Sequence, residues 1–213
     1  MDLPLFPLHT VLFPGASLPL HVFEQRYRAM MEHILAGDRR FGVVMIREGM
    51  ESGGFAEVHE VGCVGVLRVL ERADDGTMDI VITGAERFRI ERRLPDDPFP
   101  RAEVSLIVPE PVGPGVEERF AAARAMLPRY IDVLSRMKAT APVEADLEGE
   151  PVDVSFRIAA LLEVDLNERQ RLLACKHAAA RLQLAAALAR REALLLERIG
   201  PAVGTPRGEY SPN

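Results

Sequence analysis

The chain of 213 residues contains 48% hydrophobic and 27% charged residues, ordinary values for a globular protein with one large domain or two small ones. Its net charge is −6, and residues 1–112 carry this whole excess, because acidic and basic side chains balance over residues 113–200. A nucleic-acid binder needs a basic patch, since phosphate neutralisation supplies most of its affinity. The composition therefore argues against DNA binding and disfavours RNA binding.

No targeting or membrane segment is visible in the sequence. Residues 1–27 lack the cationic start and unbroken apolar helix of a secretory signal, and no apolar run approaches the roughly 20 residues of a membrane helix. The two cysteines, Cys63 and Cys175, lie far apart in the chain, and we expect them to be reduced thiols that fill the core. These features predict a cytoplasmic protein without a membrane association.

The first 27 residues alternate apolar side chains with prolines. Proline breaks helices and lacks the N–H group that a central strand donates, so we expect short extended pieces separated by turns. Pro14-Gly15 is the expected sharp corner.

The pattern that follows predicts a helix over 24–36 and a strand over 41–46, and glycines indicate a turn or mobile loop at 48–54. Asp75-Gly76 lies between two β-branched runs, 61–70 and 78–90, which is the strongest local signal for a β-hairpin. Both faces of the first run are apolar, as in a barrel wall, and one more strand is expected over 99–108.

A proline- and glycine-rich linker at 109–115 separates this β-rich half from a helical half. The apolar spacing predicts a helix over 116–138, and an acidic solvated loop follows at 144–150. We expect a short helix from Asp153 to Leu162, a helix start at Asp165, and an uninterrupted Ala/Leu-rich helix from Arg169 to Ile199. Residues 201–213 are predicted to form a flexible tail.

The order and spacing of several short motifs resemble the N-terminal (substrate-binding) domain of Lon proteases. These motifs are LPLFPL (3–8), VLFPG (11–15), LPL (18–20), FEQRY (23–27), RFGVV (40–44), GAERFRI (84–90), IAALL (158–162), ERQRLL (168–173) and RL (181–182). The resemblance covers nearly all of residues 1–200. It implies an α+β fold, in which a PUA-like β-rich pseudo-barrel (1–112) is followed by a helical bundle (113–200).

Lon proteases continue into ATPase and serine–lysine protease domains, and this sequence shows no signature of either. It lacks the G-x-x-x-x-G-K-[ST] phosphate loop, and no nucleophile-elbow sequence surrounds Ser105, Ser135 or Ser155. We therefore expect a stand-alone, non-catalytic family member without a cofactor. The resemblance implies a recognition module that binds unfolded or apolar polypeptide segments, and RNA binding is the alternative that PUA-like barrels suggest.

The proline-rich loop 12–20 is the expected peptide-binding surface, because irregular backbone cannot turn all of its large apolar side chains inward. We predict Phe13, Leu18 and Leu20 as peptide-binding residues, with Phe13 and Leu18 exposed beside the helix that begins near Glu24. Core packing of Phe13 is the alternative.

Three further clusters have a structural and a functional interpretation. Glu24 and Tyr27 could belong to an active site. We expect instead that Glu24 complements the helix dipole and that Tyr27 docks the helix on the barrel. Arg87 and Arg89 share one strand face, which we expect to be solvated rather than an anion site. The scattered histidines predict no zinc site, although Cys63 and Cys175 with two histidines would be the alternative.

Overall fold

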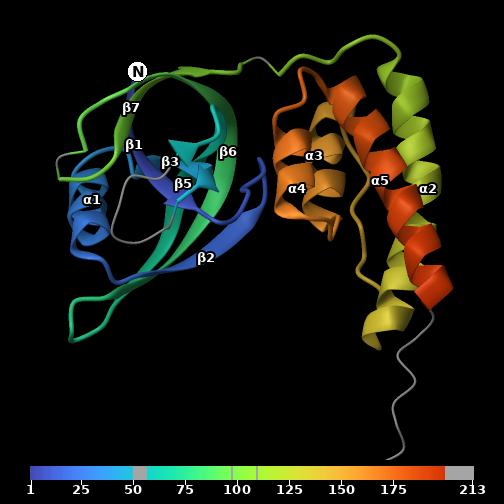
Figure 1. Cartoon of the computed structure of the whole chain (residues 1–213), viewed down its shortest axis with the longest axis horizontal. Coiled ribbons are helices and arrows are strands. Elements are labelled where there is room, and N and C mark those ends of the chain that lie inside the picture. The colour runs from blue at the N-terminus through green and yellow to red at the C-terminus, as the bar shows by residue number, and fades with distance from the viewer. Residues whose placement is uncertain (50–56, 97, 109, 200–213) are drawn as a thin grey trace, which may run out of the picture.

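The computed structural model of the chain describes residues 1–49, 57–96, 98–108 and 110–199. Most of the predicted glycine-rich loop and the whole predicted tail lie outside these residues. The first half contains the strands and one helix and the second half contains only helices among the described residues, as predicted (Figure 1). The fold is therefore α+β, with the β-rich part first.

The predicted hairpin, the first helix and the helix after the linker are all confirmed. The strands are β1 (Asp2–Leu8), β2 (Ser17–Val22), β3 (Arg40–Glu48), β4 (Glu57–Val58), β5 (Val61–Arg72), β6 (Met78–Arg93) and β7 (Arg101–Leu106). The helices are α1 (Gln25–Leu35), α2 (Val116–Lys138), α3 (Pro151–Leu161), α4 (Leu166–Leu173) and α5 (Ala178–Ile199).

Five strands close into a barrel in the order β1-β7-β6-β5-β3, because β3 also pairs with β1 in parallel. The predicted short extended pieces separated by a turn at Pro14-Gly15 are confirmed as β1 and β2, and β1 lies between β7 and β3 although it contains two prolines. Its residues Asp2–Pro4 pair with β7, whereas Leu5–Leu8 pair with β3. Since β1 changes partners along its length, few of its residues must donate on both sides, and the two prolines are tolerated.

The barrel interior is small and filled by apolar side chains. Leu5, Val44, Val64 and Phe88 meet there from different strands, and all four are buried. Gly62 makes room for this packing, because a Cβ at its position would lie 2.5 Å from the Phe88 ring. The glycine in the hairpin strand therefore permits the close approach of strands that a small barrel requires.

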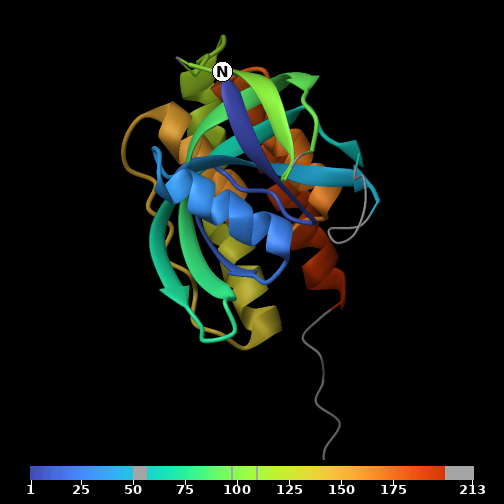
Figure 2. The same ribbon diagram turned by 90° about the vertical axis from the view of Figure 1, so that its left-hand side faces the viewer.

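Helix α1 covers the outer face of the barrel on the side away from the bundle (Figures 1 and 2). Tyr27 is buried and stacks on Phe6 with ring centroids 4.2 Å apart, and the Arg26 guanidinium lies over the Tyr27 ring at 4.5 Å. Arg26 Nε donates to Glu24 at 3.1 Å. These contacts support the structural interpretation of this cluster, in which Tyr27 docks the helix on the sheet.

Helices α2 to α5 form one bundle beside the barrel, with α3 and α4 nearest to it and α2 and α5 farther away (Figure 1). Helices α2 and α5 run parallel, since Arg119 bonds Gln183 at 3.1 Å and Arg129 bonds Glu197 at 2.8 Å farther along both helices. Helix α4 begins as predicted, because the Asp165 side chain accepts from the Glu168 N–H at 2.9 Å. None of the helices in the described ranges is long and apolar enough to cross a membrane.

The predicted continuous helix from Arg169 to Ile199 is wrong, because the chain breaks between α4 and α5 at residues 174–177. The peptide N–H groups of Ala178 and Ala179 donate to the carbonyls of Pro111 and Val112 in the linker, at 2.8 and 2.9 Å. His177 Nδ1 accepts from the Ala180 N–H at 3.0 Å. Partners from outside the helix thus satisfy the N-terminal groups of α5, and no glycine or proline is needed at the break.

Candidate functional site

The expected solvated face of β6 is wrong for Arg87, whose side chain is 1% exposed. Its guanidinium donates to both carboxylate oxygens of Glu110, at 2.6 and 2.7 Å, and to the carbonyls of Leu173 and Cys175 at the end of α4. Arg89, two residues on, is half exposed and pairs with Glu60. Arg87 therefore joins barrel, linker and bundle and offers no open anion site.

A second arginine completes this junction. Arg181 is fully buried, lies over the Phe156 ring at 3.6 Å and donates to Ser155 Oγ at 2.7 Å and to the Leu172 carbonyl at 3.2 Å. Burial and the neighbouring Arg87 lower the pKa of Arg181 to about 10. The junction is a packed, charged core between the two halves of the molecule.

Phe13 also lies in this core, with no exposed surface, so its predicted exposure is wrong. The loop crosses β6 at Gly84, where a Cβ would lie 2.1 Å from the Phe13 carbonyl oxygen, and backbone bonds on both sides of this crossing hold the loop to Gly84. The Arg169 guanidinium of α4 lies 5.2 Å from the centre of the Phe13 ring. Phe13 thus fills the space between barrel and bundle.

Leu18 and Leu20 are both partly buried on β2, and Leu20 lines a depression beside the start of α1. We call this depression the β2–α1 groove; it has a volume of about 270 Å³ and includes Phe6, Leu20, Phe23 and Tyr27. Phe23 was not predicted, yet its side chain is 58% exposed. The groove lies where the sequence placed it, beside β2 and the start of α1, but Phe13 and Leu18 take no part in lining it.

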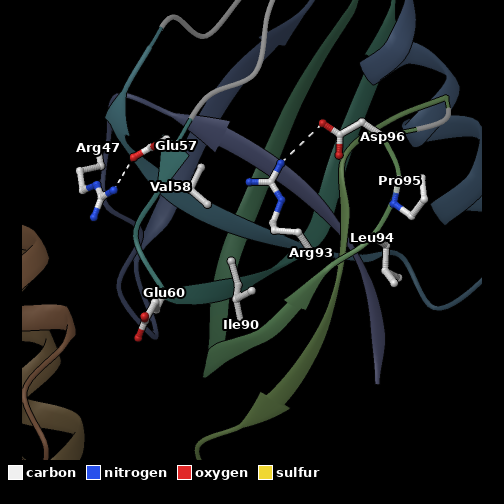
Figure 3. Close-up of a pocket in the computed structure, with 9 residues that line it drawn as sticks. All are labelled: Arg47, Glu57, Val58, Glu60, Ile90, Arg93, Leu94, Pro95 and Asp96. Atoms are coloured by element: carbon white, nitrogen blue, oxygen red, sulfur yellow. Dashed lines mark hydrogen bonds and ion pairs between the residues drawn. The ribbon is translucent and has the colours of Figure 1, made fainter.

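A larger pocket, of about 650 Å³, lies between β4, the end of β6 and the segment that leads to β7. We call it the rim pocket. Its floor is formed by Val58, Ile90, Leu94 and Pro95, and Figure 3 shows Val58 and Ile90 directed toward the same space. Val58 and Ile90 also pack against the barrel interior, so the pocket lies at one mouth of the barrel.

The charged side chains around the rim pocket are all held in ion pairs. Arg47 pairs with Glu57, Arg93 pairs with Asp96 at 3.5 Å (Figure 3), and Glu60 pairs with Arg89 outside the pocket lining. Val58 and Ile90 lie between the first two pairs, whereas Leu94 and Pro95 lie on the far side of the Arg93 side chain (Figure 3). The arrangement suits an apolar side chain better than a reacting group.

A second, more polar space of about 430 Å³ adjoins the rim pocket and shares Arg47, Val58 and Glu60 with it. We call it the junction cleft, because α4 forms its far wall through Gln170 and Arg171. His59 lies in the cleft, and burial followed by the charge of Arg47 lowers its pKa.

The described residues contain no group of three or more His, Cys, Asp or Glu side chains that could hold a metal ion. Cys63 is buried in the barrel wall, and burial raises the pKa of its thiol strongly. Cys175 is partly buried, and burial raises its pKa as well. Both thiols are reduced in the structure, and neither has the depressed pKa of a reactive cysteine.

Sequence reasoning missed both the rim pocket and the junction cleft. Their residues come from four separate stretches of the chain. Two of these stretches overlap the motifs GAERFRI (84–90) and ERQRLL (168–173), which carry the family resemblance but do not indicate a pocket. The available signal was the isolated apolar pair Leu94-Pro95 at the end of a charged strand, which is too weak to predict a pocket.

Comparison with known proteins connects this geometry to a family. Residues 2–191 match the family model described as the ATP-dependent protease La (LON) substrate-binding domain. Lon proteases from Anaeromyxobacter dehalogenans and Cytophaga hutchinsonii are both 28% identical, over 98% and 80% of this chain.

The solved Lon N-terminal domain protein from Xanthomonas campestris is 27% identical and superposes with a TM-score of 0.64, covering 88% of this chain and 98% of that one. The N-terminal domain of the Mycobacterium avium complex Lon protease has the same fold, with a TM-score of 0.63 at 15% identity over 89% of this chain. This chain spans about a quarter of the length of the curated relatives it matches. Because the family model covers almost the whole chain, the protein belongs to the Lon substrate-binding domain family.

Proposed function

We propose that the protein is a non-catalytic recognition module that binds exposed apolar segments of unfolded polypeptides, with the rim pocket as its main site. The observation that carries this proposal is the apolar floor of Val58, Ile90, Leu94 and Pro95 at the mouth of the barrel. A pocket of about 650 Å³ is large enough for one or two large side chains. The family supports substrate recognition, and the apolar preference is inferred from the floor.

The strand beside the pocket favours an extended ligand. β4 is a two-residue strand at one end of the sheet path, and it pairs with β3 alone among the described strands. An edge strand offers backbone donors and acceptors to an added peptide, while a neighbouring pocket takes an alternate side chain. The β4 edge and the rim pocket together suit an extended segment with one apolar anchor.

Absence of catalysis is part of the proposal. The charged side chains that line the pocket are held in three ion pairs, Arg47 with Glu57, Arg93 with Asp96 and Glu60 with Arg89, and no Ser, Thr, Cys or Lys lies among the lining residues. Such a site can hold a segment but offers no group to attack it. Delivery of bound segments to another protein, as an adaptor, would follow from this binding.

The β2–α1 groove is the second candidate site. Leu20 lines it, and Phe23 places a large ring in solvent beside it. Phe13 is no longer a candidate, because its side chain is fully buried. The groove has less than half the volume of the rim pocket, and for this reason we rank it second.

The test uses the full chain and a fluorescently labelled client that alkylation of its cysteines keeps unfolded. We expect Leu94→Ser to weaken client binding about fivefold, because it removes apolar surface from the floor. The matched control is Leu195→Ser on the exposed face of α5, which should leave affinity unchanged. Thermal unfolding of each variant shows whether the fold is intact.

Three outcomes would contradict parts of the proposal. If Phe23→Ser weakens client binding and Leu94→Ser does not, the binding site is the β2–α1 groove and not the rim pocket. Failure of the wild-type chain to bind any unfolded client would refute polypeptide recognition. Tight, salt-dependent binding of single-stranded RNA instead of the client would favour the RNA-binding alternative.

A further inference from the structure

We propose that the junction cleft binds an acidic side chain of the polypeptide segment whose apolar residue enters the rim pocket. The preferred ligand is therefore an extended segment with a carboxylate close to a large apolar residue. This inference rests on the proposed function and adds the chemistry of the second subsite.

The first argument is charge. The cleft is lined by Arg47, Arg89 and Arg171, and Glu60 is the only acidic side chain among its lining residues. Arg47 and Arg89 are paired with exposed glutamates, whereas Arg171 forms no ion pair with any described residue. Arg171, on α4, therefore supplies a positive charge, unpaired among the described residues, to a cleft whose other two arginines lie on the acidic β-rich half of a protein of net charge −6. Charge complementarity therefore points to an anionic ligand group.

The second argument is an unsatisfied acceptor in the cleft wall. Gln170 is 4% exposed, and its Nε2 donates to the Val61 carbonyl at 2.9 Å. This bond fixes the orientation of the amide, so Oε1 is the atom left over, and it has no hydrogen-bond partner. A buried acceptor without a donor is unfavourable, and a peptide N–H entering the cleft would satisfy it.

A third argument is the neighbouring imidazole. His59 Nε2 is shielded from solvent and also lacks a partner, and the ring borders the same cleft. A neutral imidazole can donate one hydrogen bond to a carboxylate oxygen from this atom. Gln170 and His59 thus hold one acceptor for the backbone and one donor for the acid, which a ligand reaches once the cleft wall opens around these two shielded atoms.

The two subsites are adjacent, because they share Arg47, Val58 and Glu60. In an extended chain, side chains two positions apart lie on the same face, about 6–7 Å from each other. An apolar residue and an acidic residue separated by one position can therefore reach both spaces at once. A backbone between them would run beside β4 and Gln170.

The test measures binding of labelled, acetylated and amidated dodecapeptides of Gly, Ser and Thr that carry Phe and Glu two positions apart. We expect Glu→Gln in the peptide to weaken binding by about two- to fivefold, because it removes the charge that meets the arginines. Arg171→Gln in the protein should weaken the Glu peptide to the same extent and leave the Gln peptide unaffected. Arg171→Lys should retain most of the affinity, and Arg190→Gln on α5 is the matched control.

The outcomes separate this inference from the proposed function. Equal binding of the Glu and Gln peptides, with sensitivity to Leu94→Ser, would overturn the acidic subsite and keep the apolar one. If the Arg171→Gln variant still prefers the Glu peptide over the Gln peptide to the same extent, the acidic subsite lies elsewhere and the proposal is refuted. A preference for a free carboxyl terminus over the internal Glu would show that the cleft recognises chain ends. Absence of binding by the Phe-containing peptides, together with no binding of unfolded client, would refute the function itself.

Discussion

The buried barrel–bundle junction and the open junction cleft beside it contain arginines in opposite roles. Arg87 and Arg89 lie two positions apart on β6, yet Arg87 is 1% exposed and Arg89 is 49% exposed. The bundle and Glu110 of the linker supply the partners of Arg87, whereas Arg89 lines the open junction cleft. The elements that pack on a strand therefore decide whether an arginine on it stabilises the junction or remains free to bind a ligand.

A bulge in the hairpin lies just before the two arginines. Cys63 pairs with Arg87 and Gly65 pairs with Gly84, so β6 has one more residue than β5 between these two pairs. From Arg87 to Arg89 the pairing with β5 is regular, so the two arginines share one face and Phe88 faces the barrel interior, as predicted. Their different exposure therefore comes from the elements that cover each of them and not from the bulge.

The largest effect on the free energy of unfolding should appear when each of the two arginines is replaced separately. Arg87→Met should lower the free energy of unfolding by about 3–5 kcal/mol, because it leaves Glu110 and two carbonyls at the end of α4 without their donor. Arg89→Met, the matched control, should lower it by less than about 1 kcal/mol, since an exposed ion pair contributes little. Urea unfolding measures both, and equal effects would contradict the comparison.

Phe13→Ala should destabilise the protein by about 3 kcal/mol, at the lower end of the range for a buried phenylalanine, because the Arg169 side chain can partly fill the space. Phe23→Ala, at an exposed ring, should change stability by less than about 0.5 kcal/mol. Chemical denaturation of the two variants checks this pair. A mild effect of Phe13→Ala would mean that the loop is not part of the junction core.

A smaller effect is expected at the helix that carries the cleft wall. Asp165→Ala should lower stability by about 1 kcal/mol, because the side chain caps the N-terminus of α4 through the Glu168 N–H. Asp153→Ala in the first turn of α3 is the control, since no side-chain cap bond is present at that helix start. In thermal unfolding, Asp165→Ala should lower the melting temperature more than Asp153→Ala does, and equal shifts would contradict the prediction.

The smallest effect concerns pH. The pKa of His59 is lowered in the folded protein, first by burial and then by the charge of Arg47, so the unfolded chain binds a proton at higher pH than the folded one. Its contribution to stability is therefore complete above about pH 6.5, declines below that value and levels off below the folded pKa. Proton NMR titration of the imidazole measures the pKa directly. The decline should vanish in His59→Gln and persist in His33→Gln, and an upward-shifted pKa would contradict the prediction.

Local patterns were sufficient for most elements of the fold. Asp75-Gly76 predicted the β5–β6 hairpin, and Asp165 predicted the start of α4, because each signal acts within a few residues. The break before α5 had no such signal, since its N–H groups are satisfied by Pro111 and Val112 in the linker. The candidate site was predicted less well: Leu20 lies in a groove, but Phe13 is core and the rim pocket was missed.

The sequence by itself determined the two halves, the family and most helix and strand positions, because side-chain periodicity and turn chemistry are properties of neighbouring residues. It also showed, through its charge distribution, which half is acidic. Only the tertiary structure decided that β1 closes the barrel, that Arg87 is buried and that Val58, Ile90 and Leu94 meet in one pocket. These features depend on contacts between distant segments, and the free energy of such contacts is set by what packs on each face rather than by the local sequence.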